Sequence, residues 1–238
     1  MKISKAATLC VAAGLAAAAC HQPAADKGSG AAGYGPGSFG YDLDFLRSHD
    51  SGLVVLSSAG GTEQVAVSAK YQGKVFTSTA TGEEGQSFGW VHYKAFSGTP
   101  DAHMNAYGGE NRLWLGPEGG HYSLFFKPGA KMVFDNWVTP RAFDTEPWQL
   151  ASREDSTSVT LHKDMDLENY RGTLLKIGVD RKISLLSASR IEQQFGLGDV
   201  DSVAMVGYRT DNVLTNRGDF DWTDRTGMPC VWILDMFN

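Results

Sequence analysis

The sequence predicts an all-β protein built as an antiparallel β-sandwich. Short stretches rich in β-branched residues recur along the chain, and Gly, Ser and Thr separate them. Helical stretches do not alternate with these strands, which argues against a parallel α/β sheet. The roughly 200 residues that follow the N-terminal region suffice for one domain with a sizeable core.

Alternation marks the strands most clearly at residues 64–69, where Val65, Val67 and Ala69 would share one face. Strands of the first half are predicted at residues 53–56, 64–69, 74–80, 88–96, 113–115, 122–126 and 131–134. Strands of the second half are predicted at residues 158–162, 173–179, 182–186, 202–208 and 229–236. Two short helices are predicted, at residues 42–49 and 187–195, because their apolar residues fall on one side.

The N-terminus predicts secretion and a lipid anchor. Lys2 and Lys5 precede an apolar run of small residues that reaches Ala19, so residues 1–19 are typical of a signal peptide. Cys20 follows directly, which favours a lipoprotein cleavage site whose thiol is acylated and holds the protein at the membrane. The alternative is a plain signal peptide cut near Ala19. The run is too short and too rich in alanine for a membrane-spanning helix.

A flexible tether is predicted at residues 20–40, followed by one domain at residues 41–238, because the tether has too few apolar residues to fold. His at position 21 favours the outer membrane of a Gram-negative bacterium. Loss of residues 1–19 leaves 19 Lys and Arg against 27 Asp and Glu, a net charge of −8. This balance argues against nucleic acid as a partner.

The C-terminal segment is apolar and strand-like up to its last residue. An edge strand that ends so abruptly would expose apolar surface and unpaired backbone, so we expect the natural chain to continue and this domain to be incomplete. The alternative is a core strand that ends the domain. Acylation of Cys20 would leave Cys230 as the one remaining thiol, so no disulfide is expected.

Residues 105–120 combine charged, amide and aromatic side chains with five glycines, which indicates a binding surface. Arg112 could grip vicinal hydroxyls or a carboxylate with two hydrogen bonds, while Glu110 and Asn111 add further polar groups. Tyr107 and Trp114 could stack on a sugar ring. An equally weighted alternative is a hairpin turn that carries a surface salt bridge.

Acid–base candidates and further sugar contacts lie around this segment. Glu118 occupies a predicted turn, where it could accept sugar hydroxyls or act as a general base. His121 lies beside that turn and is a weaker catalytic candidate. Asn212 and Asn216 resemble amide pairs of sugar sites, although turn-forming Asn is the default alternative. The histidine spacing predicts no metal site, and no cofactor motif is present, so no cofactor is expected.

Four stretches carry a family resemblance: residues 71–80, 85–90, 107–120 and 229–238. With them the chain resembles the N-terminal part of a family of bacterial envelope lipoproteins of unknown function. That family is distantly similar to the galactose mutarotase (aldose 1-epimerase) supersandwich.

The resemblance implies a sugar-handling site in which Asn111 and Arg112 contact the sugar. It also implies that any catalysis is that of an aldose 1-epimerase-like isomerase, with a general-base Glu that would lie beyond residue 238. Lys74 and His92 depart from the pattern, where Arg and Asn are expected.

Two functions therefore compete. The first is a lipid-anchored envelope protein that binds a sugar or glycan, and the second is a non-catalytic protein-interaction module of an envelope assembly. Binding of a sugar by the folded protein separates them.

Overall fold

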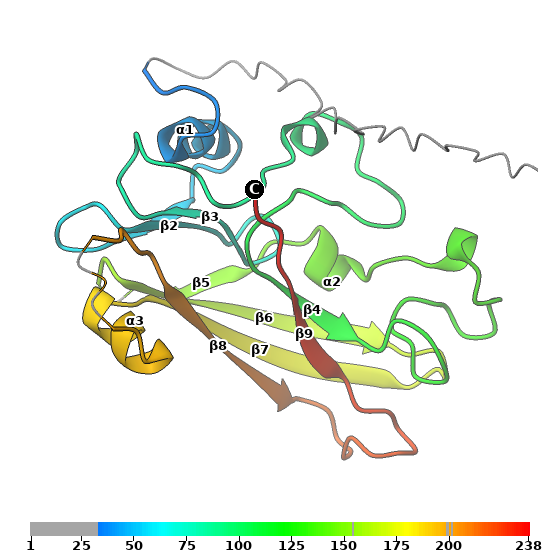
Figure 1. Ribbon diagram of the computed structural model, residues 1–238. Coiled ribbons are helices and arrows are strands. Elements are labelled where there is room, and N and C mark those ends of the chain that lie inside the picture. The colour runs from blue at the N-terminus through cyan, green and yellow to red at the C-terminus, as the bar shows by residue number, and fades with distance from the viewer. Residues whose placement is uncertain (1–32, 154, 199, 201) are drawn as a thin grey trace, which may run out of the picture.

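The computed structural model describes residues 33–153, 155–198, 200 and 202–238 (Figure 1). The predicted signal peptide, Cys20 and the tether up to residue 32 lie outside the described residues. The described part confirms the all-β prediction: its nine strands form antiparallel sheets arranged as a sandwich-like fold. None of its helices is long and apolar enough to span a bilayer.

The first sheet has three antiparallel strands in the order β1-β2-β3. They are β1 (Val54–Ser57), β2 (Gln64–Ser68) and β3 (Lys74–Thr79). Both faces of this sheet are buried, because side chains alternate between two cores. On β2, Val65 joins the main core, whereas Ala66 joins a second core under the helix α1.

The second sheet has four antiparallel strands in the order β5-β6-β7-β8. They are β5 (Gln149–Ser152), β6 (Ser158–Glu168), β7 (Leu174–Leu185) and β8 (Tyr208–Asn216). The helix α3 (Ala188–Phe195) lies in the connection between β7 and β8. β6 and β7 pair along the full length of β6, while the short β5 pairs only with its first half.

A third pair, β4 (Arg112–Gly116) with β9 (Cys230–Leu234), completes the sandwich. β4 is buried throughout, and Trp114 lies opposite Trp232 across the pair. The main core gathers apolar side chains from all three sheets, so the sheets form a single packed unit. β9 is the more exposed partner.

The domain begins earlier than the sequence predicts. Helix α1 (Phe39–His49) starts with Ser38, whose side-chain oxygen caps the helix by accepting from the Tyr41 N–H. Phe39 is fully buried beside Leu43. The tether prediction is therefore wrong for its last residues, because Phe39 packs into the second core.

Other strand predictions failed because the segments have no continuous strand partner. Residues 88–96 make isolated bridges and the 3₁₀ helix η1 (Tyr93–Phe96), and residues 122–126 form a buried loop. Residues 131–134 and 202–208 are also largely irregular, with the 3₁₀ helix η2 at Phe134–Asn136. The helix α2 (Arg141–Asp144) and the strand β5 were not predicted.

Candidate functional site

The polar segment at residues 105–120 does not form one surface. Its two buried charges, Glu110 and Arg112, stand on either side of Asn111 and enter different surroundings. Arg112 belongs to a closed polar cluster around Asp144. Glu110 lines a cavity.

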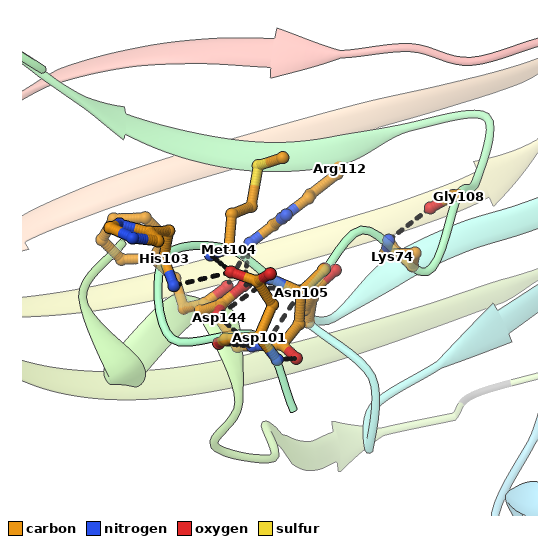
Figure 2. Close-up of polar contacts among 10 residues, drawn as sticks. Lys74, Asp101, His103, Met104, Asn105, Gly108, Arg112 and Asp144 are labelled. Atoms are coloured by element: carbon orange, nitrogen blue, oxygen red, sulfur yellow. Dashed lines mark hydrogen bonds and ion pairs between the residues drawn. The ribbon is translucent and has the colours of Figure 1, made fainter. Parts of the chain in front are cut away.

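Arg112 is 1% exposed and is held inside the protein. Its Nη2 lies 3.0 Å from Asp144 Oδ1 and 3.1 Å from the Phe143 carbonyl oxygen (Figure 2). The guanidinium carbon lies 4.4 Å from the centre of the Trp114 ring. Burial lowers the pKa of Arg112 to about 10, and the Asp144 charge opposes that shift. The expected ligand contact through Arg112 does not fit this arrangement, because the guanidinium is buried and its Nη2 is bonded to Asp144 and to the Phe143 carbonyl oxygen.

Asp144 gathers further donors. Asn105 donates to it from its backbone N–H and from its side-chain amide, at 2.7 Å for the latter (Figure 2). The Gln72 amide donates to the Asp144 side chain at 3.0 Å, while the Gln72 backbone has a φ of 64°. A residue other than glycine rarely takes that conformation, so the amide contacts hold Gln72 in a strained position.

Lys74 is a second buried cation beside this cluster. It is fully buried and donates to the Gly108 carbonyl oxygen (Figure 2). Burial drives the pKa of Lys74 well below its usual range, and the neighbouring Arg112 charge adds to the effect. The region around Arg112 is therefore an internal polar network.

The two aromatic residues proposed to stack on a ligand also lie inward. Trp114 is 2% exposed, and its ring lies 5.5 Å from the Phe125 ring in the main core. Tyr107 is half-buried, with ring centres 4.9 Å from Tyr71 and 5.0 Å from Phe96. The prediction that Trp114 stacks on a ligand is wrong, because its ring is buried in the core and has no exposed face.

Glu110 has a different environment. Its carboxylate accepts from the Ser78 backbone N–H at 2.5 Å and from the Ser78 hydroxyl at 2.8 Å, and it hydrogen-bonds to the Tyr208 side chain. Burial raises the pKa of Glu110, and these hydrogen bonds only partly oppose the shift. Burial and the Glu110 charge likewise raise the pKa of Tyr208.

A cavity of about 550 Å³ opens beside this pair. Its walls come from β3, helix α3, residues 204–208 and the C-terminal segment, and most of them are apolar. Phe237 lines it and is 60% exposed. A concave apolar space with a few converging polar groups is the usual form of a small-molecule site. Perturbed acids at such a place are candidates for proton transfer.

Arg181 connects two of the predicted residues, Asn111 and Asn212. Although it is charged, it lies on the core-facing side of β7 with Val179 and Ile183 and is fully buried. Its Nη1 donates to Asn212 Oδ1 at 2.7 Å, and its Nη2 donates to the side-chain oxygen of Asn111. Burial lowers the pKa of Arg181 to about 10. Two predicted amide residues thus meet through a cation that sequence reasoning missed.

The remaining predicted residues lie apart. Glu118 is half-buried and follows the cis peptide bond between Gly116 and Pro117, and His121 is exposed. Neither makes a hydrogen bond or ion pair to Glu110 or Arg112 in the part of the chain that the structure describes. Asn216 bonds within its own turn, where its Oδ1 accepts from the Gly218 N–H at 2.9 Å.

Sequence reasoning also missed Tyr208 and Asp144. Each is far along the chain from residues 105–120 and follows no motif, so no local signal could have identified it. Residues 33–153, 155–198, 200 and 202–238 contain no group of three or more His, Cys, Asp or Glu placed to hold a metal ion.

Comparisons with known proteins give a family. Neither the curated proteins nor the solved structures contain a significant match to this chain. The model of a family of unknown function, DUF6786, matches residues 37–238, which is most of the chain, and this protein therefore belongs to that family.

Proposed function

We propose that this protein is a lipid-anchored protein of the cell envelope that binds a sugar or glycan in the cavity beside Glu110. The observation that supports it most is the pairing of Glu110 with Tyr208 at an apolar cavity of about 550 Å³. A sugar offers hydroxyls to polar groups and an apolar ring face to aromatic side chains. Phe88 and Phe237 line the same cavity and can supply the aromatic contact.

Charge supports this assignment over the Arg112 region. The Glu110 carboxyl contacts neutral donors, so an incoming hydroxyl can join its hydrogen bonds without breaking an ion pair. Arg112, in contrast, would have to leave Asp144. The mutarotase resemblance of the sequence adds independent support for a sugar ligand. If the bound sugar reacts, Glu110 replaces Glu118 as the candidate proton carrier.

Sugar binding is tested on the mature chain carrying Cys20→Ser, which stays in solution. A thermal-shift screen against monosaccharides and oligosaccharides identifies a ligand by a rise in Tm, and calorimetry then measures its Kd. We expect Glu110→Gln and Tyr208→Phe to weaken binding about tenfold or more, because each removes a hydrogen bond to the ligand site. The matched control Glu118→Gln removes the same charge and keeps the affinity.

Two results would overturn the proposal. A well-folded protein whose Tm rises with none of the sugars would exclude sugar binding. Loss of binding in Glu118→Gln with full binding in Glu110→Gln returns the site to the turn that follows β4.

The membrane attachment rests on the sequence, through the small residues that precede Cys20. Labelled palmitate should enter the full chain and not its Cys20→Ser variant, and the labelled protein should fractionate with outer membranes. Equal labelling of both chains would exclude Cys20 as the anchor.

A further inference from the structure

We propose that the outer edge of β6, at residues 164–168, receives an extended basic segment of a partner protein as an added β-strand. This surface is separate from the Glu110 cavity, so it does not depend on the proposed sugar function.

The edge is open because β5 is short. β7 pairs with β6 from Ser158 to Glu168, but β5 reaches only from Thr160 to His162 on the other side. No described residue forms a backbone hydrogen bond to that side of residues 164–168. In an antiparallel strand, alternate residues direct their N–H and C=O groups to each side, so this stretch offers unpaired donors and acceptors. Such an edge is a template for a further strand.

Space is available along this edge. A cavity of about 720 Å³ is lined on one side by all five residues from Asp164 to Glu168. The rest of its wall comes from the loop at 124–130, from the stretch 135–140 that begins in η2, and from the start of helix α2. Phe126 and Val138 in that wall provide apolar contacts for the side chains of an added strand.

The charge of this cavity selects a basic occupant. Asp164, Asp166 and Glu168 are exposed and alternate with buried residues, so their carboxylates share one face of the strand. Asp135 and Glu146 also line the cavity, and its cationic lining residues are Lys127 and Arg141. The walls therefore carry three more negative than positive charges.

Part of this charge forms no ion pair, although Lys176 lies opposite Asp166 across the β6–β7 pair. Asp164 lies 3.8 Å from the Arg217 Nε, and Glu146 pairs with Lys163 at 2.9 Å. Asp166 and Glu168 have no ion-pair partner among the described residues. Lysine or arginine at alternate positions of an added strand would lie opposite these carboxylates, as cross-strand pairs do.

The test uses a blocked nine-residue peptide of alternating Lys and Val, labelled for fluorescence anisotropy against the full mature chain. We expect saturable binding that weakens as salt rises, since exposed charges are screened. A version with N-methylated central amides keeps every charge but has lost the N–H groups that pair with a neighbouring strand. We expect its affinity to fall by about tenfold or more. Equal binding of both peptides, or of neither, would overturn the proposal.

Matched protein variants locate the surface. Asp166→Asn with Glu168→Gln should weaken peptide binding by about threefold to tenfold, as expected for two exposed ion pairs. The control Asp219→Asn with Asp221→Asn removes the same charge from exposed residues outside the cavity. An equal loss in both variants would show attraction to net charge alone and would contradict a site on β6.

Discussion

Glu110 and Arg112 flank Asn111 in the sequence and are equally buried. They differ in how their charge is balanced. Arg112 faces the carboxylate of Asp144. Glu110 has neutral hydrogen-bond donors, and no cation lies within ion-pair distance of it in the described part of the chain. Removing one partner of a buried ion pair leaves an uncompensated charge and destabilises the fold, whereas a buried acid without a cationic partner favours its neutral form. The comparison separates a structural charge from a candidate functional one.

The largest effect is expected from Asp144→Asn. The change removes the charge that balances Arg112 and leaves a buried cation, which should lower the free energy of unfolding by about 3–5 kcal/mol. Urea unfolding measures it, with the exposed Asp221→Asn as a control that stays within about 0.5 kcal/mol. A loss as small as that of the control would mean that Arg112 is not held by Asp144.

A pH-dependent effect is expected from Glu110→Gln. Because the pKa of Glu110 is raised above its ordinary value of 4.5, ionisation disfavours the folded state. The stability of the wild type should therefore be full below pH 4.5 and fall as pH rises from 4.5 through the folded pKa. Relative to the wild type, the Tm of the variant should rise between pH 4 and pH 7. A constant Tm difference across this range would contradict a buried, unbalanced carboxyl.

The smallest effect is expected at His162, which lies partly exposed on the second sheet. Its hydrogen bond to Asp180, at 2.7 Å, raises the pKa of His162 above its ordinary value of 6.5. The stabilisation is full below pH 6.5 and is lost as pH rises through the folded pKa. His162→Gln should lower the unfolding free energy by about 0.5 kcal/mol at pH 5.5 and by less at pH 9. An equal loss at both values would exclude a charged contact.

The strands that the sequence predicted well are those whose side chains alternate between two apolar cores. β2 and β3 are examples. β9, which is largely exposed, was predicted from its run of apolar residues alone. The strand prediction failed for residues 122–126, because Phe125 and its neighbours lie in a loop that packs into the core without a strand partner. The long strand β7 was divided into two, since Asp180 and Arg181 interrupt its apolar pattern.

The site was less predictable than the fold, because its contacts join distant parts of the chain. The sequence identified Glu110, but Tyr208 lies almost a hundred residues further on. Glycine density suggested an exposed surface at residues 105–120. Burial of Arg112 and Trp114 instead depends on Asp144 and Phe125, which no local pattern reveals.

Arg181 has a consequence for how the protein unfolds. Its guanidinium donates to the Gly73 carbonyl oxygen before β3, to Asn111 before β4 and to Asn212 on β8. Separation of any one of these segments would leave part of a buried cation without acceptors. Local opening of one sheet therefore costs nearly as much as global unfolding, and slow amide hydrogen exchange should report one cooperative unit across all three.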